Sequence, residues 1–235
     1  MNGVGIGSHL RILVISREMR EINMILMGIG GAVIKTAKDE LVTVINAKKI
    51  NVLLHCGASV FHDFQRNTEN LESHSHTLDD LLEDYSLDRH ASSLVWEWIR
   101  WGNVPKKTVT GLCYENNIDV MLFTALGTDF WQLFCDEWEL IAKKCHDDFY
   151  RLCGIIEKDN FTYINMGSSV IMPEVFTKAL ALIGIDNLKN FKAHVVDFLP
   201  NQYRPLTRVS KYGKYFNLTH KEFLQKWLDD ELDLV

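Results

Sequence analysis

A histidine and a carboxylate, His62 and Asp63, follow the run of small residues Cys56-Gly57-Ala58-Ser59. This run comes after the apolar segment 50–54, which is typical of a strand buried on both faces. In an open α/β sheet, ligands bind where such strands end, and ionisable side chains can meet them there. A histidine paired with a carboxylate suits proton abstraction near neutral pH. We therefore expect the active site here, with His62 as candidate general base and Asp63 as candidate substrate ligand.

Three further predicted strands end in small-residue turns. The first, residues 22–27, leads into the Gly28–Gly31 turn and a helix predicted over Val33–Lys48. The second, residues 118–126, leads into Gly127-Thr128-Asp129. The third, residues 161–166, leads into Gly167-Ser168-Ser169. A strand, a glycine turn and a helix together place unpaired amide groups where a phosphate can bind. Glycines also permit tight turns and close packing, so the pattern alone leaves both roles open.

The remaining elements alternate in the same way. The sequence predicts a helix over Asp136–Leu152 stopped by Gly154, a helix from Pro173 to Leu182, a strand over Phe191–Phe198 and a helix over Thr219–Leu228, with an irregular basic stretch at Pro200–Lys214. Glu174 falls in the first turn of its helix, where the helix dipole alone explains a negative charge. This alternation predicts an α/β fold, a parallel sheet with helices on both faces, in a single domain over residues 1–235.

Two other stretches have unusual composition. Asn67–His90 is acidic, and its composition predicts a loop over the sheet with one short helix. It contains His74 and His76, but a metal site there is disfavoured because no third ligand has suitable spacing. The following segment LVWEWIRWG contains three tryptophans, which indicate a buried helix or a subunit contact.

Composition limits the possible classes of protein. The chain has 235 residues, 47% of them hydrophobic, with a net charge of −6, which argues against nucleic acid or an anionic membrane as the main partner. No apolar run is long enough for a membrane span, and residues 1–20 carry charges where a signal peptide is apolar. The five cysteines form no CxxC pair and are expected to be reduced thiols. These features predict a cytoplasmic protein without a metal centre.

The turns, read in order, resemble deoxyhypusine synthase and related uncharacterised bacterial proteins. The segments that carry the resemblance are GGAVIK (30–35), CGASVFHDF (56–64), LGTD (126–129), YINMGSSVIMPEVFTKAL (163–180) and YRPLTRV (203–209). The resemblance covers residues 23–227. It implies a Rossmann-like NAD-binding fold shared with sirtuins, and homodimers or homotetramers with sites at subunit contacts.

The resemblance also implies roles for individual residues. Gly30, Gly31, Gly57, Ala58 and the Gly167-Ser168-Ser169 turn would face NAD, and Asp129 matches a carboxylate that binds the polyamine. His62 stands where the synthase has a glutamate, and Glu174 stands where it has a histidine near the chemistry. Lys214 has a spacing to Phe223 like that around the synthase's catalytic lysine, although Tyr212-Gly213-Lys214 also resembles an upstream, non-catalytic segment.

Three functions remain open at this stage. The leading one is an NAD-dependent enzyme that oxidises an amine, a polyamine or a related small substrate and transfers the resulting group, with His62 or Glu174 as general base and Lys214 as nucleophile. The second is a non-catalytic dinucleotide-binding protein, a sensor or an oligomeric partner, which the altered amine-binding residues favour. The third is a hydrolase acting on a nucleotide or N-glycosidic bond.

Overall fold

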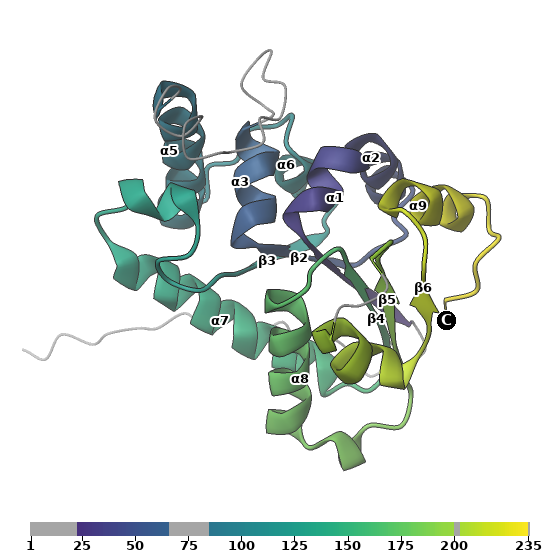
Figure 1. The fold of residues 1–235 in the computed structure, drawn as a ribbon. Coiled ribbons are helices and arrows are strands. Elements are labelled where there is room, and N and C mark those ends of the chain that lie inside the picture. Colours follow the sequence, from purple (N-terminus) through teal and green to yellow (C-terminus); the bar gives the residue numbers. More distant parts are fainter. Residues whose placement is uncertain (1–22, 66–84, 200–202, 235) are drawn as a thin grey trace, which may run out of the picture.

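The computed structural model describes residues 23–65, 85–199 and 203–234. In this part of the chain six strands form one parallel sheet in the order β3-β2-β1-β4-β5-β6 (Figure 1). The strands are β1 (Met24–Ile29), β2 (Val52–Cys56), β3 (Asp119–Phe123), β4 (Phe161–Met166), β5 (Phe191–Val196) and β6 (Tyr215–Phe216). The predicted α/β Rossmann-like sheet is confirmed. The strand order reverses between β1 and β4, where such sheets bind ligands.

Helices cover both faces of the sheet (Figure 1). On one face lie α1 (Gly31–Thr36), α2 (Lys38–Asn46), α3 (Gly57–Gln65), α5 (Tyr85–Trp101), α6 (Val109–Glu115) and α9 (His220–Leu228). On the other lie α8 (Ile171–Ile183) and the C-terminal half of α7 (Trp138–Ile156). Along β1, Ile25, Met27 and Ile29 face the first group and Leu26 faces the second. This alternation explains why the strands are apolar throughout.

Several predicted boundaries were wrong. The single helix predicted over residues 33–48 is two helices, because Ala37 leaves helical geometry (φ −146°) between α1 and α2. Gly154 does not stop α7, which continues to Ile156; a glycine in a helix costs only about 1 kcal/mol, less than the packing of the last turn supplies. Cys56 to Ser59 is not an open turn, since α3 begins at Gly57 directly after β2.

The C-terminal region is more regular than its sequence indicates. The stretch predicted as irregular contains a π-helical turn, η4 (Pro205–Val209), a 3-10 turn, η5 (Ser210–Tyr212), and the edge strand β6. Two 3-10 turns, η2 (Phe130–Phe134) and η3 (Ile185–Asn187), complete the described elements. The predicted terminal helix is confirmed as α9, where Thr219 and Glu222 form a reciprocal capping box.

Residues 86–90, predicted as loop, belong to α5, and Trp98 of that helix is buried while Trp101 is 67% exposed. His74, His76 and the predicted short helix before residue 85 lie outside the described residues, as does the amino-terminal part of the single domain predicted over residues 1–235. Among the described residues, no helix combines the length and apolar character needed to cross a bilayer. All five cysteines are free thiols.

Candidate functional site

The carboxyl ends of the central strands are joined by backbone hydrogen bonds. The amide of Gly30, after β1, donates to the carbonyl of Met166 at the end of β4 (2.8 Å), and the amide of Gly167 donates to Val196 at the end of β5 (3.1 Å). The three turns therefore form one continuous edge at the point where the strand order reverses.

Glycine is required at both contact points of this edge. A Cβ atom placed on Gly30 would lie 1.9 Å from the carbonyl oxygen of Gly167, so the two turns meet backbone to backbone. Gly167 has φ +62°, a conformation that favours glycine, and a Cβ there would lie 2.6 Å from Nε2 of His220. Gly30 and Gly167 were predicted as cofactor-binding residues, and the structure brings them into direct contact.

His220, the first residue of α9, places an unpartnered acceptor against this turn. Its side chain is 2% exposed, and Nδ1 lies 3.2 Å from Oγ1 of Thr36. That hydroxyl lies 2.8 Å from the carbonyl of Ala32, and if it donates there the matching tautomer has the proton on Nδ1 and a lone pair on Nε2. Nε2 is buried and has no hydrogen-bond partner among the described residues. Burial lowers the pKa of His220, which favours this neutral form, although Asp197 acts in the opposite direction.

Asn165 of β4 supplies a second unpartnered acceptor beside the same turn. Its amide nitrogen donates to the carbonyl of Ser168 (3.0 Å), while its buried Oδ1 has no partner within the described part of the chain. Buried polar atoms are almost always hydrogen-bonded, so the two exceptions mark this turn as a place where a water or a ligand can bind. Such a ligand would have to donate hydrogen bonds, as hydroxyl, amide or amine groups do.

The start of α3 forms the neighbouring part of the site. Gly31 of α1 packs closely on it, since a Cβ on Gly31 would lie 3.1 Å from Cδ2 of His62 and 3.2 Å from Cβ of Ala58. His62 is half-buried, and its Nδ1 lies 3.2 Å from Oε1 of Gln65. Because an amide oxygen only accepts, Nδ1 carries the proton and Nε2 of the neutral ring is the basic atom.

Asp129 lies directly over the first residue of α3. A Cβ on Gly57 would overlap Oδ2 of Asp129 at 1.8 Å, and the hydroxyl of Thr124 donates to the same oxygen. Burial raises the pKa of this half-exposed carboxyl, and hydrogen bonds from Thr124 and Thr128 partly oppose that. The absence of a side chain at Gly57 therefore leaves room for the carboxylate of Asp129. Asp129, which lies in the segment after β3, thus places a carboxylate beside the start of α3.

A buried polar network holds β2, α3 and α6 together beneath this surface. His55 is fully buried, with Nδ1 2.9 Å from the hydroxyl of Ser59 and Nε2 3.2 Å from that of Thr110. Burial lowers its pKa to about 3, so the ring is neutral. Burial also raises the pKa of the Cys56 thiol, which leaves it unreactive.

Asp63 belongs to this network rather than to the exposed site. Its side chain is fully buried and accepts hydrogen bonds from the amides of Val109 (2.7 Å) and Thr110 (2.9 Å) and from the Thr110 hydroxyl (2.8 Å). Adjacent residues on a helix point about 100° apart, so His62 faces the site while Asp63 faces the interior. The expected substrate-binding role of Asp63 does not agree with this position, which gives it the structural role of fixing α6.

Glu174 and Ser168 have partners that explain them structurally. Glu174 is paired with Lys178, Arg204 and Arg208. Partial burial raises its pKa, but the hydrogen bonds and charges of Lys178 and Arg208 outweigh it and leave the pKa below the usual value. A carboxylate held in its ionised form by several cations is a weak base. Ser168 accepts a hydrogen bond from the amide of Met172 (3.2 Å) at the start of α8, whereas Ser169 is exposed.

Lys214 lies apart from these residues. It is exposed and immediately precedes the edge strand β6, which is separated from β4 by β5. Its backbone amide donates to Nδ1 of His194 (3.0 Å). The structure therefore brings together Gly30, Gly31, Gly57, Ala58, Gly167, His62 and Asp129 near the carboxyl ends of the strands, and leaves Lys214 at the edge of the sheet.

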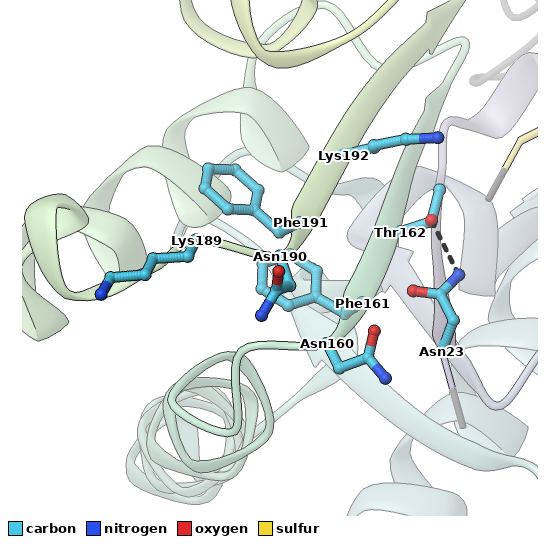
Figure 2. A pocket seen from close by; sticks show the side chains of 8 residues that line it. All are labelled: Asn23, Asn160, Phe161, Thr162, Lys189, Asn190, Phe191 and Lys192. Carbon is cyan, nitrogen blue, oxygen red and sulfur yellow. Dashed lines mark hydrogen bonds between the residues drawn. The ribbon is translucent and has the colours of Figure 1, made fainter. Parts of the chain in front are cut away.

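A cavity of about 320 Å³ opens at the opposite, amino edge of the sheet (Figure 2). Its lining residues are Asn23, Asn160, Phe161, Thr162, Lys189, Asn190, Phe191 and Lys192. The amide of Asn23 donates to Thr162 (2.9 Å), and the side chain of Lys189 points away from the other lining residues in Figure 2. Parallel sheets bind ligands at the carboxyl edge, and Asn23 and Thr162 of this cavity bond each other, so we place the candidate site at the carboxyl edge.

Comparison with known proteins supports the fold. The sequence matches no protein-family model and no curated protein. The structure resembles AgrE in a ternary complex with ornithine and NAD+ (16% identity, TM-score 0.58, 89% of this chain and 30% of AgrE). It also resembles ArgZ, an arginine dihydrolase from the ornithine-ammonia cycle in cyanobacteria (21%, 0.55, 93% and 32%), and a candidate deoxyhypusine synthase from Entamoeba histolytica (10%, 0.58, 93% and 78%).

These similarities define a class by fold. The chain is an α/β protein with a Rossmann-like parallel sheet, and it shares this fold with the candidate deoxyhypusine synthase and with parts of AgrE and ArgZ. It spans about a third of the AgrE and ArgZ chains. All three identities are below 25%, so the resemblance to deoxyhypusine synthase is supported at the level of fold.

Sequence reasoning missed His220, Asn165 and the ion pairs of Glu174. The signal for His220 was its place at the start of a capped helix after a short apolar segment, and the signal for Asn165 was an amide inside a buried strand. The arginines that pair with Glu174 were visible only as a basic stretch.

Proposed function

We propose that this protein is an NAD-dependent enzyme that oxidises an amine or a related small substrate, with transfer of the oxidised group as an optional second step. The observation that carries the proposal is the Gly30–Gly167 contact flanked by the unpartnered acceptors of His220 and Asn165. This contact lies where the strand order of the sheet reverses, which is where such sheets bind ligands. The fold also resembles that of AgrE, whose structure was solved with ornithine and NAD+.

The residues at this edge suit a dinucleotide. Gly31, Ala58 and Gly167 are partly exposed and Ser169 is exposed, while Gly30, Gly57 and Ser168 lie buried beneath them. The first amides of α3 have no acceptor within the helix. His220 and Asn165 present acceptors for hydroxyl or carboxamide donors. NAD+, when bound, supplies a hydride acceptor.

The remaining roles follow from the positions of two side chains. Asp129 would bind a substrate cation, because its carboxylate is half-exposed beside α3. His62 would accept a proton at Nε2. We favour His62 over Glu174 as general base because Glu174 is paired with three cations.

Lys214 as nucleophile, a homodimer or homotetramer and a cytoplasmic location stay predictions. Lysines that attack carbonyl groups at neutral pH are normally desolvated, whereas Lys214 is exposed. This exposure and the ion pairs of Glu174 favour the second candidate function, a dinucleotide-binding protein without catalysis.

Native mass spectrometry of the protein titrated with NAD+ tests the proposal. We expect saturable binding of one NAD+ per subunit, and His220→Leu should weaken it at least tenfold because an unpartnered acceptor is removed. His146→Leu is the matched control, since His146 is exposed on α7. No binding up to about 1 mM NAD+, or equal binding by both variants, would contradict the proposed site. Loss of hydride transfer in His62→Gln with NAD+ binding retained would separate an enzyme from a sensor.

A further inference from the structure

Glu174 is the centre of a group of charged residues that we call the Glu174 cluster: Glu174, Lys178, Arg204 and Arg208. Lys178 Nζ lies 3.0 Å from Oε2 of Glu174, and Arg204 Nε lies 3.0 Å from Oε1. Nη1 of Arg208 donates to the same Oε1. Three cations thus surround one carboxylate, which leaves two positive charges on a chain whose net charge is −6.

The backbone that carries the two arginines is held rigidly. Arg204 immediately precedes the π-helical turn η4, and Arg208 lies within it. The hydroxyl of Thr207 donates to the carbonyl of Tyr203 (2.7 Å), and Val209 is fully buried. π-Helical turns occur frequently at functional sites. The ion pairs with Glu174 orient both guanidinium groups in the structure.

The Glu174 cluster is connected to the candidate site through the start of α8. Glu174 is the fourth residue of α8, and α8 follows directly on the Gly167–Val170 turn. The side chains of Arg204 and Arg208 are 45% and 32% exposed. Each guanidinium has five N–H donors on three nitrogens and uses one nitrogen on Glu174, so donors remain for a ligand.

We propose that Arg204 and Arg208 form a subsite for a carboxylate of the substrate, so that the substrate is an amino acid-like molecule with an amine and a carboxylate rather than a polyamine. Guanidinium groups bind carboxylates in a bidentate geometry and with charge-assisted hydrogen bonds. A simple diamine would meet repulsion from the two uncompensated positive charges. The proposal rests on the proposed function, since it names the substrate class of the same site.

The test compares 4-aminobutanoate with 1,4-diaminobutane, which share a four-carbon length and one amine and differ at the other end. Binding is measured by calorimetry with and without saturating NAD+. We expect 4-aminobutanoate to bind at least tenfold more tightly, and Arg208→Gln to abolish this preference while NAD+ affinity changes less than twofold. Arg208→Lys should retain part of the preference, because it keeps the charge and loses the bidentate geometry.

Arg100→Gln is the control, since Arg100 is a similarly exposed arginine (41%) paired with Glu137. Thermal unfolding of each variant confirms that it is folded. Equal or tighter binding of the diamine, or an unchanged preference in Arg208→Gln, would overturn the proposal. A tenfold loss of NAD+ affinity in Arg208→Gln, together with competition by inorganic phosphate, would assign the subsite to a dinucleotide phosphate instead. If NAD+ does not bind, the proposed function fails, while the titrations without NAD+ still decide the carboxylate preference.

Discussion

The two edges of the parallel sheet differ in how their polar groups are satisfied. At the amino edge, Asp159 accepts hydrogen bonds from the amides of Lys189 (2.8 Å) and Asn190 (2.9 Å), and Asn23 bonds Thr162. At the carboxyl edge, two acceptors on Asn165 and His220 lack partners in the described part of the chain. The cavity shown in Figure 2 lies at the amino edge, whereas the two unpartnered acceptors lie at the carboxyl edge. Under the proposed function, the unpaired buried groups and not the cavity mark the ligand edge.

The two edges also differ in exposed apolar surface. Leu126, Val170, Phe198 and Leu199, which follow β3, β4 and β5, are 47%, 44%, 49% and 51% exposed. At the amino edge, Phe161 is 1% exposed and stacks on Phe191 with ring centroids 5.2 Å apart. Exposed apolar groups beside unpartnered acceptors are typical of a surface that binds another molecule.

The largest expected effect is that of Gly30→Val. A Cβ at this position would lie 1.9 Å from a backbone oxygen, so the joined turns must separate. We expect the free energy of unfolding to fall by about 3 kcal/mol or more in urea titration. Gly154→Ala is the control, because nothing lies within 4 Å of its Cβ; it should raise stability by roughly 0.5 kcal/mol. Similar stabilities of the two variants would show that the turns do not meet as described.

The buried histidine beneath the carboxyl edge should make stability depend on pH. His55 is neutral in the folded protein, where its pKa is about 3. In the unfolded chain its pKa has the ordinary value of 6.5, so the ring takes up a proton when the pH falls below 6.5. The unfolded state thus binds more protons between these values, so stability falls as pH falls. From pH 6.5 to pH 4.5 we expect His55 to contribute a loss of about 2 to 3 kcal/mol. Urea unfolding of His55→Gln should show a flatter dependence than wild type, and parallel curves would contradict this account.

Asp63→Asn distinguishes the structural network from the site above it. The variant leaves one of three donors without an acceptor, so we expect a loss of about 2 kcal/mol in stability. NAD+ affinity should change less than twofold by calorimetry. The exposed control Asp147→Asn should change neither quantity. A substrate or cofactor ligand would show the reverse pattern, with affinity lost and stability retained.

Substitutions at the amino edge should have the smallest effects. Lys189→Ala combined with Asn190→Ala removes two exposed side chains at the cavity, and we expect stability to change by less than about 0.5 kcal/mol. NAD+ affinity, measured by calorimetry, should stay within twofold of wild type. A tenfold loss of affinity would move the ligand to the amino edge.

The sequence was sufficient for the fold and for part of the site. The apolar runs located the five long strands, and helical spacing located the terminal helix that forms α9, because these signals are local. The contact between Gly30 and Gly167 depends on strand order, which no local pattern specifies.

Two assignments show why the rest of the site needed the structure. Asp63 stands next to His62 in sequence but points into the interior, since the orientation of α3 decides which residue faces the ligand edge. Glu174 was an acid–base candidate because it stands where deoxyhypusine synthase has a histidine, and its partners Arg204 and Arg208 are 30 and 34 residues away in sequence. Residue type and spacing therefore pointed to the carboxyl edge, and tertiary contacts determined the hydrogen-bond and ion-pair partners of each side chain.

The most direct test of the account is an NMR titration of glycine-selectively 15N-labelled protein with NAD+. The account predicts that the amide resonances of Gly30, Gly31 and Gly167 shift together and saturate, while that of Gly184, next to η3, remains in place. Absence of any shift at Gly30 and Gly167 at saturating NAD+ would contradict the assignment of the carboxyl edge as the dinucleotide site.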